Sequence, residues 1–151
     1  MRQSQPHQST HESGTWASNS PVTDGRHVIA SFGSNGLFCL DAATGKVVWK
    51  NAEFEFDVIQ GAASSPILHG ELLILTCDGI DHQFIVALDK YTGKLKWKQP
   101  RAHLEATEKE TRPGQKRINK MAYSTPLIQT INGKLQLICS GAFHSAAYNP
   151  A

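Results

Sequence analysis

The sequence has few cysteines, little net charge and no long apolar run, and each shortage excludes a class of protein. Its three cysteines, Cys39, Cys77 and Cys139, are odd in number and far apart, which argues against a disulfide framework. Each lies in or beside an apolar run, so we expect buried free thiols. The formal charge of +2 does not indicate nucleic acid or an anionic membrane as a partner. No apolar run approaches the roughly 18 residues of a membrane-spanning helix.

The sequence also lacks common catalytic and metal-binding motifs. Its seven histidines form no HExxH pair and have no Cys-x-x-Cys partner, and neither a GxSxG elbow nor a P-loop occurs. Asp78 and Asp81, in CDGIDH, lack the acidic spacing of a calcium loop, so we expect them in a polar hairpin turn. We therefore predict no catalytic residue, no metal site and no cofactor.

The N-terminal segment, residues 1–14, is polar and contains Pro6. It has no apolar stretch like that of a secretory signal. We therefore expect either a cytoplasmic protein or a chain that has lost its leader.

What the sequence does contain is an internal repeat, which is the first feature to seek because it determines the fold. Pro21, Pro66 and Pro126 mark equivalent places 45 and 60 residues apart. The extra length of the second interval is mostly a charged segment, residues 101–120, which we expect to be a solvated loop. The repeat units are predicted at residues 15–51, 59–100 and 121–151, the last of them incomplete.

Each unit is typical of four short antiparallel strands. In the first, turns are predicted at Asp24-Gly25, Asn35-Gly36 and Thr44-Gly45, where glycine accepts the positive φ of a tight hairpin. The runs VIASF, LLILT and FIVAL are almost wholly apolar, so we expect them to be buried on both faces. The lysine-rich runs KVVWK and KLKWK suit an outer strand. Small sheets covered on both faces and repeated in this way predict β-propeller blades.

One element occurs twice, as LDAATGKVVWK at 40–50 and LDKYTGKLKWK at 88–98. Its glycine can form a left-handed turn, its aspartate can bind turn amides or the threonine hydroxyl, and its tryptophan can pack on the neighbouring blade and donate its N–H there. We therefore predict that the repetition serves to dock blade on blade. The predicted docking residues are Asp41, Thr44, Gly45 and Trp49 in the first copy, and Asp89, Thr92, Gly93 and Trp97 in the second.

This element resembles the tryptophan-docking motif AxDxxTGxxxW of PQQ-like repeat propellers, the quinoprotein alcohol dehydrogenase-like family. ALDKYTGKLKW (87–97) matches every fixed position, and CLDAATGKVVW (39–49) differs only at Cys39. AYNPA (147–151) is similar to the start of a third copy, with Asn149 in place of aspartate. The resemblance implies an all-β, partial propeller of four-stranded antiparallel blades. About three blades cannot close a ring, so we expect a fragment of a larger propeller, or a module that closes by association.

The family contains redox enzymes and non-catalytic scaffolds, and the resemblance leaves both open. Its dehydrogenases hold pyrroloquinoline quinone and calcium with a stacking Trp, a carboxylate base and, in many members, adjacent cysteines, a pair that does not occur here. Our hypothesis is a non-catalytic segment that binds other proteins or further blades. The alternative is part of a PQQ-dependent dehydrogenase whose quinone and calcium site lies outside this chain.

A third hypothesis is a sugar- or polymer-binding propeller. Trp16 and Tyr123, which lie near strand starts, are the candidates for contacts with a ligand on the propeller axis. Most relatives are bacterial and work in the periplasm or outside the cell, so the resemblance implies one of those compartments.

Overall fold

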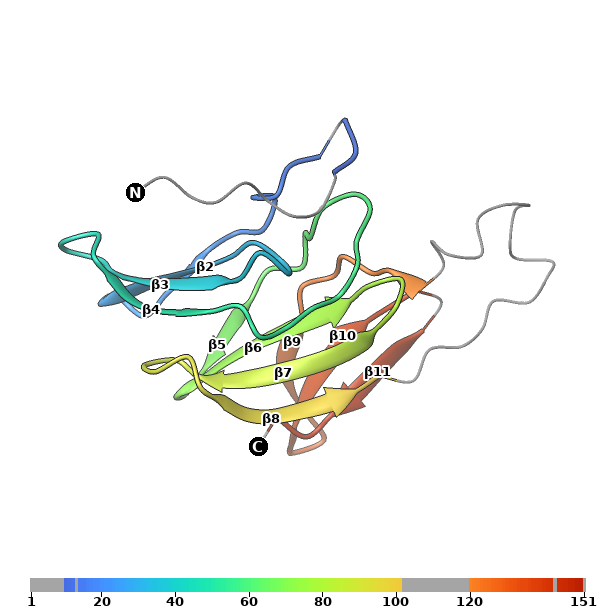
Figure 1. The fold of residues 1–151 in the computed structure, drawn as a ribbon. Coiled ribbons are helices and arrows are strands. Elements are labelled where there is room, and N and C mark those ends of the chain that lie inside the picture. Colours follow the sequence, from blue (N-terminus) through green and yellow to red (C-terminus); the bar gives the residue numbers. More distant parts are fainter. Residues whose placement is uncertain (1–9, 13, 102–119, 143, 151) are drawn as a thin grey trace.

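The computed structural model describes residues 10–12, 14–101, 120–142 and 144–150, which form three antiparallel sheets (Figure 1). The all-β, partial propeller fold is confirmed. Most of the predicted polar segment 1–14 and of the charged loop 101–120 lies outside the described residues. Within the described part, no helix is long and apolar enough to span a membrane.

Each sheet follows the chain order of its strands, with neighbours joined by hairpins. The first sheet contains β1 (Val22–Thr23), β2 (His27–Ser31), β3 (Leu37–Asp41) and β4 (Val47–Asn51). The second contains β5 (Ile67–His69), β6 (Leu72–Asp78), β7 (Gln83–Asp89) and β8 (Leu95–Pro100). The third contains β9 (Leu127–Ile131), β10 (Lys134–Ser140) and β11 (Ser145–Tyr148), and is the incomplete blade that the sequence predicts.

Glycines with positive φ lie in the turns that the sequence marks. Gly25, Gly36 and Gly45 have φ of 89°, 112° and 67°, as their turns require. The turn between β9 and β10 is formed by Asn132 and Gly133, both with positive φ, which is the geometry of a two-residue hairpin. Local turn chemistry therefore determines where each strand ends.

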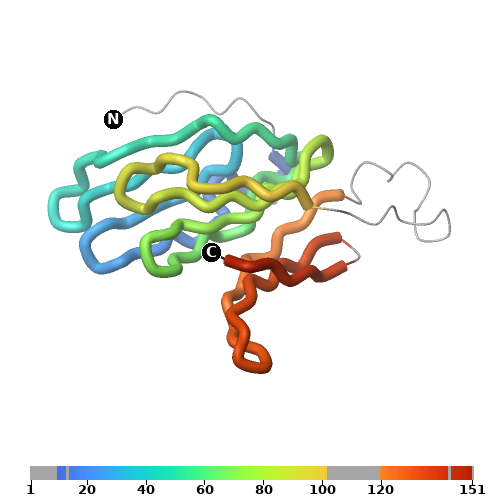
Figure 2. Tube along the Cα trace, turned by 90° about the horizontal axis from the view of Figure 1, so that it is seen from below, coloured from blue at the N-terminus to red at the C-terminus, as the bar shows by residue number. Residues whose placement is uncertain are grey.

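The second sheet lies between the other two, and its central strands β6 and β7 are buried on both faces (Figures 1 and 2). Along β7, Phe84, Val86 and Leu88 pack toward the first sheet, whereas Ile85 and Ala87 pack toward the third. The alternation of side chains along a strand explains why FIVAL contains no polar residue.

The prediction that VIASF is buried on both faces is wrong. In β2, His27, Ile29 and Ser31 are buried, but Val28 and Ala30 are only half-buried. The physical reason is that the first sheet is covered by a neighbouring sheet on one face only within the described residues. The second sheet has neighbours on both sides, so LLILT and FIVAL are buried as expected.

The three cysteines are buried free thiols, as the sequence predicts. Burial raises the pKa of Cys39 and of Cys139 to about 11, and raises the pKa of Cys77 further. At neutral pH all three thiols are therefore protonated and serve as small apolar side chains.

The prediction of a solvated loop is wrong at its first residue, Arg101, because this residue is only 5% exposed. It follows β8 and crosses to the third sheet. Its guanidinium forms an ion pair with Asp78 at the end of β6, in the second sheet, and donates to the Cys139 carbonyl of the third sheet at 3.2 Å. A side chain placed in a charged run thus fastens the second blade to the third.

The electrostatics of this pair depend on burial. Removal from water raises the pKa of Asp78 to about 6, while the Arg101 guanidinium opposes the rise. Since the pKa of Asp78 in the folded protein lies above its ordinary value of about 3.9, the fold favours the protonated carboxyl. Its contribution to stability is therefore largest at low pH and is lost as the pH rises past about 6.

We expect Arg101→Met to lower the free energy of unfolding by about 3–5 kcal/mol at pH 8, because it leaves a buried carboxylate without its partner. The loss should shrink at pH 5, where the Asp78 carboxyl is protonated. Urea unfolding at both pH values measures this, with Arg26→Met, at an exposed arginine, as the control. Equal losses at the two pH values would contradict the pairing.

Candidate functional site

The two copies of the repeated element form the same tight turn after β3 and β7. In the first, Asp41 Oδ1 accepts from the Thr44 amide at 2.8 Å and from the Thr44 hydroxyl at 2.7 Å. These bonds, that from the hydroxyl foremost, lower the pKa of Asp41. In the second, Asp89 Oδ1 accepts from the Thr92 amide at 3.0 Å. The aspartate and threonine of each copy are thus brought together.

Burial alone would raise the pKa of Asp89, but Lys96 and Thr92 outweigh it and lower the pKa. The Lys96 ammonium lies 3.1 Å from Asp89 Oδ2. Both aspartates are therefore ionised at neutral pH, the state in which a carboxylate accepts bonds from turn amides.

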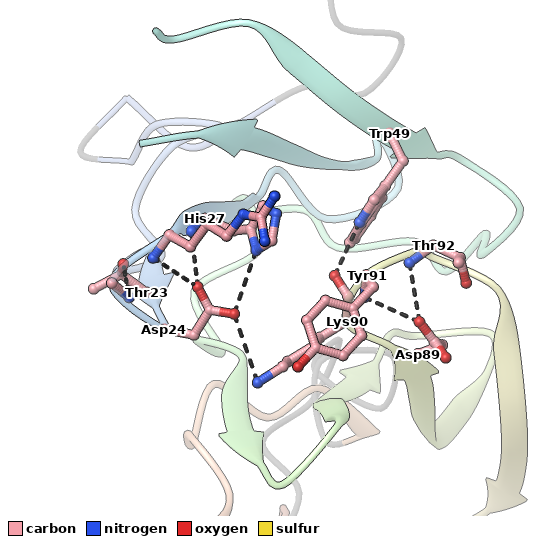
Figure 3. A network of polar contacts seen from close by, with 10 residues as sticks. Thr23, Asp24, His27, Trp49, Asp89, Lys90, Tyr91 and Thr92 are labelled. Carbon is pink, nitrogen blue, oxygen red and sulfur yellow. Dashed lines mark hydrogen bonds and ion pairs between the residues drawn. The ribbon is translucent and has the colours of Figure 1, made fainter. Parts of the chain in front are cut away.

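The two copies differ in the side chain that packs against the glycine of the turn. The Trp49 indole of the first blade packs on Gly93 of the second, where an added Cβ would lie 2.5 Å and 2.7 Å from two indole carbons. Trp49 Nε1 donates to the Lys90 carbonyl at 3.0 Å (Figure 3). Gly45 has a similar φ, but nothing lies within 4 Å of its Cβ position. Gly93 therefore serves both its own turn and the tryptophan of the preceding blade.

Asn51 joins the same junction and was not predicted from the sequence. It lies two residues after Trp49 in β4 and is therefore on the same face of the strand. Its Nδ2 donates to the Gly93 carbonyl at 2.8 Å, and the side chain is 9% exposed. Alternate residues of a strand share a face, so the position of Asn51 two residues after Trp49 was the sequence signal for this contact.

A second group of polar contacts crosses the junction beside Trp49 (Figure 3). Asp24, in the turn before β2, accepts from the His27 amide at 2.7 Å and lies 3.5 Å from the Lys90 ammonium of the second blade. The amide bonds, that of His27 foremost, lower the pKa of Asp24 well below its ordinary value. The sequence did not reveal this ion pair because Asp24 and Lys90 lie in turns of two different blades, far apart along the chain.

The segments that precede β1, β5 and β9 are joined by a repeated hydrogen bond. The Ser20 amide donates to Ser65 Oγ at 2.9 Å, and the Ser65 amide donates to Thr125 Oγ1 at 3.2 Å. Each of these residues precedes a proline, which favours extended backbone. The hydroxyl residue before the proline in each unit was a readable signal of this contact.

Trp97 lies at the junction of the second and third blades. It is half-buried and packs on a core that includes Leu137, Cys139 and Tyr148. Its Nε1 is buried and has no acceptor within the described residues. The two predicted docking tryptophans therefore differ, since only Trp49 both packs on a glycine and donates to the next blade.

The two candidates for axial contacts lie in different surroundings. Trp16 is 39% exposed at the surface of the N-terminal segment. Tyr123 is partly buried beside the core of the first two blades, and its hydroxyl donates to Gln60 at 2.9 Å. Burial raises the pKa of Tyr123, so it is a neutral hydrogen-bonding group at physiological pH.

Asp81 lies in the β6–β7 turn, as predicted, whereas Asp78 is the last residue of β6 and is buried. Asp81 Oδ1 accepts from the Asp57 amide at 2.7 Å and from the His82 amide at 2.8 Å, so it holds the chain of the preceding linker. Among the residues that the structure describes, no group of three or more His, Cys, Asp or Glu side chains could hold a metal ion. The chemistry available at the blade junctions is hydrogen bonding, ion pairing and apolar contact.

Comparison with protein families finds a match over most of the chain. A family model described as outer membrane protein assembly factor BamB matches residues 3–132, which is most of the chain. A comparison with curated proteins found no match.

Comparison with solved structures shows the same fold. The structure of BamB from Moraxella catarrhalis has a TM-score of 0.56 and 21% identity, over 85% of this chain and 36% of that one. Quinohemoprotein alcohol dehydrogenase from Comamonas testosteroni has a TM-score of 0.46 and 27% identity, over 54% of this chain and 13% of that one. The chain thus spans well under half the length of either protein. The family match and the stacked antiparallel sheets show that this chain belongs to the family of PQQ-like repeat propellers whose model is described as outer membrane protein assembly factor BamB.

Proposed function

We propose that this chain is a non-catalytic propeller segment that serves as a scaffold for binding other proteins. The observation that carries the proposal is the family match, since the matching model is described as an assembly factor. The packing of Trp49 on Gly93 supports it, because these residues of the repeated element are used to join two blades. Binding would then fall to the loops and outer surfaces that a rigid stack of blades presents.

The structural part of the proposal is that the repeated element docks blade on blade. Trp49 is 8% exposed and donates its N–H across the junction, so it contributes both apolar burial and a hydrogen bond. Lys90 connects the two contacts, since its carbonyl accepts from Trp49 and its ammonium faces Asp24 (Figure 3).

We expect Trp49→Ala to lower the free energy of unfolding by about 3–5 kcal/mol, because it leaves a cavity in the junction. Trp97→Ala should cost less, because this side chain is only half-buried. Urea unfolding of both variants gives the comparison. An unchanged midpoint for Trp49→Ala would contradict the docking role.

Gly93→Ala and Gly45→Ala form a matched pair. Their φ values are 70° and 67°, so both variants force alanine into a left-handed turn, at about 1–2 kcal/mol. Only Gly93→Ala also places a methyl group against the Trp49 indole, so it should cost roughly 1–3 kcal/mol more. The difference in unfolding free energy measures the indole contact, and equal costs would show that the turn alone requires glycine.

Asp24→Asn tests the ion pair across the junction by its pH dependence. Because the pKa of Asp24 is lowered in the folded protein, its contribution is present above the ordinary pKa and is lost as the pH falls below it. The variant should therefore be less stable than the parent at pH 7, and the difference should vanish in acid. Thermal unfolding across that range measures the difference, which a pH-independent offset would contradict.

The alternative is that this chain is part of a quinoprotein dehydrogenase whose quinone and calcium site lies elsewhere. The repeated element raises this candidate, because it resembles the docking motif of the quinoprotein alcohol dehydrogenase-like family. Pyrroloquinoline quinone with calcium should give no saturable absorbance change with this chain if it is a scaffold. Saturation at stoichiometric quinone would overturn the scaffold proposal.

Binding to proteins is tested by photo-crosslinking in cells. A photo-reactive side chain at Leu95, which is 44% exposed on an outer strand, should give a discrete protein adduct. A second probe at the exposed Glu71, in the inner β5–β6 turn, shows which surface the partner uses. Absence of a protein adduct at both positions would count against the scaffold proposal.

A further inference from the structure

Three buried polar atoms at the junction of the second and third blades have no hydrogen-bond partner within the described residues. They are Asp78 Oδ1, Arg101 Nε and His144 Nε2. The three residues line one cavity of about 10 Å³, together with Gln83, Lys120, Gly141 and Ala142. An unpartnered polar atom removed from water is costly, and three beside one cavity indicate a common ligand.

The surroundings hold the Arg101 side chain in place. Its ion pair with Asp78 uses Nη1 and Oδ2, while Nη2 donates to the Cys139 carbonyl at 3.2 Å. A Cβ on Gly141 would lie 2.8 Å from Nη2, so the guanidinium packs directly against this glycine. Asp78 and Arg101 are only 3% and 1% exposed at their side chains. Their free atoms, Oδ1 and Nε, therefore cannot turn out to solvent.

The hydrogen-bond role of His144 follows from its other ring nitrogen. Nδ1 lies 3.1 Å from the Ala142 carbonyl oxygen, which can only accept a hydrogen bond. Nδ1 therefore donates to this carbonyl, and in the tautomer with its proton on Nδ1 the other ring nitrogen, Nε2, is an acceptor.

The three atoms thus present one donor, Arg101 Nε, and two acceptors, Asp78 Oδ1 and His144 Nε2. A water molecule has the complementary set, since it can accept one bond and donate two. An inorganic anion would accept from Arg101 but could not donate to the Asp78 carboxylate. A metal cation would bind the two acceptors but would face the N–H of a guanidinium.

Size selects the same ligand. The smallest cavity that holds a water is roughly 10–15 Å³, which is the size of this one. Any organic substrate or cofactor would be too large. Buried waters typically make about three hydrogen bonds to otherwise unsatisfied groups, which is the number available here.

We propose that Asp78, Arg101 and His144 form a binding site for one buried water molecule, which accepts from Arg101 Nε and donates to Asp78 Oδ1 and His144 Nε2. The water completes the polar contacts that join β6 and the end of β8 to the β10–β11 turn. This inference rests on the site alone and does not depend on the proposed scaffold function.

A high-resolution crystal structure of this chain at neutral pH tests the proposal directly. One density peak should lie within hydrogen-bonding distance of all three atoms. Direct contact between Asp78 Oδ1 and His144 Nε2, with no peak, would overturn it. An anomalous signal at the site after a bromide soak would also overturn it, since it would assign the site to an anion.

A solution measurement provides a second test. Magnetic relaxation dispersion of the water oxygen counts long-lived buried waters, and His144→Phe should lower the count by one relative to the parent. His82→Phe is the matched control, because His82 occupies the same place in the β6–β7 turn. The Gly79 amide donates to the His82 carbonyl there, as the Gly141 amide does to that of His144. His82 is exposed, so the control should leave the count unchanged. An unchanged count in His144→Phe would overturn the proposal.

Discussion

The packing of the Trp49 indole on Gly93 is the constraint on which the arrangement of the first two blades depends. The indole lies so close to Gly93 that no side chain fits between them, and its N–H reaches the Lys90 carbonyl. Asn51 and Asp24 then add a buried hydrogen bond and an ion pair to the same turn. One turn of the second blade is therefore held by two segments of the first, β4 and the β1–β2 turn, which sets the position of the two sheets relative to each other.

The two blade junctions use different physical means. The first depends on an aromatic ring over a glycine, beside a buried hydrogen bond from Asn51 and an ion pair from Asp24. The second combines an apolar core, which includes Ile85 and Leu137, with a hydrogen bond from Arg101 to the Cys139 carbonyl, and a buried ion pair with Asp78 holds Arg101 in place. A buried ion pair is sensitive to the loss of either partner, whereas a packed indole is sensitive to changes in shape. A repeat architecture thus tolerates unequal junctions, because each blade contacts only its neighbours.

The repeated element shapes the turns and blade junctions, whereas the proposed function would depend on the exposed surfaces of the blades. Aspartate, threonine and glycine shape a turn, and the tryptophan of the preceding blade can occupy that turn. In this chain, the turn at Gly45 has no such occupant within the described residues, and the turn at Gly93 does. The repeat therefore accounts for how a blade is built and joined, while recognition of a partner would depend on the surfaces that differ between blades.

The sequence by itself determined the local structure. Glycine and Asn-Gly positions marked the hairpin turns, apolar runs marked the inner strands, and the spacing of the repeated element predicted the blades and the family. These features depend on the conformations of a few neighbouring residues, so they can be read along the chain. Only the tertiary structure decided that Trp49 and not Trp97 donates its N–H to the next blade, that VIASF is covered on one face, and that Arg101 is buried beside Asp78. Each of these depends on which distant segment packs against the residue, and that information is spread over separate blades.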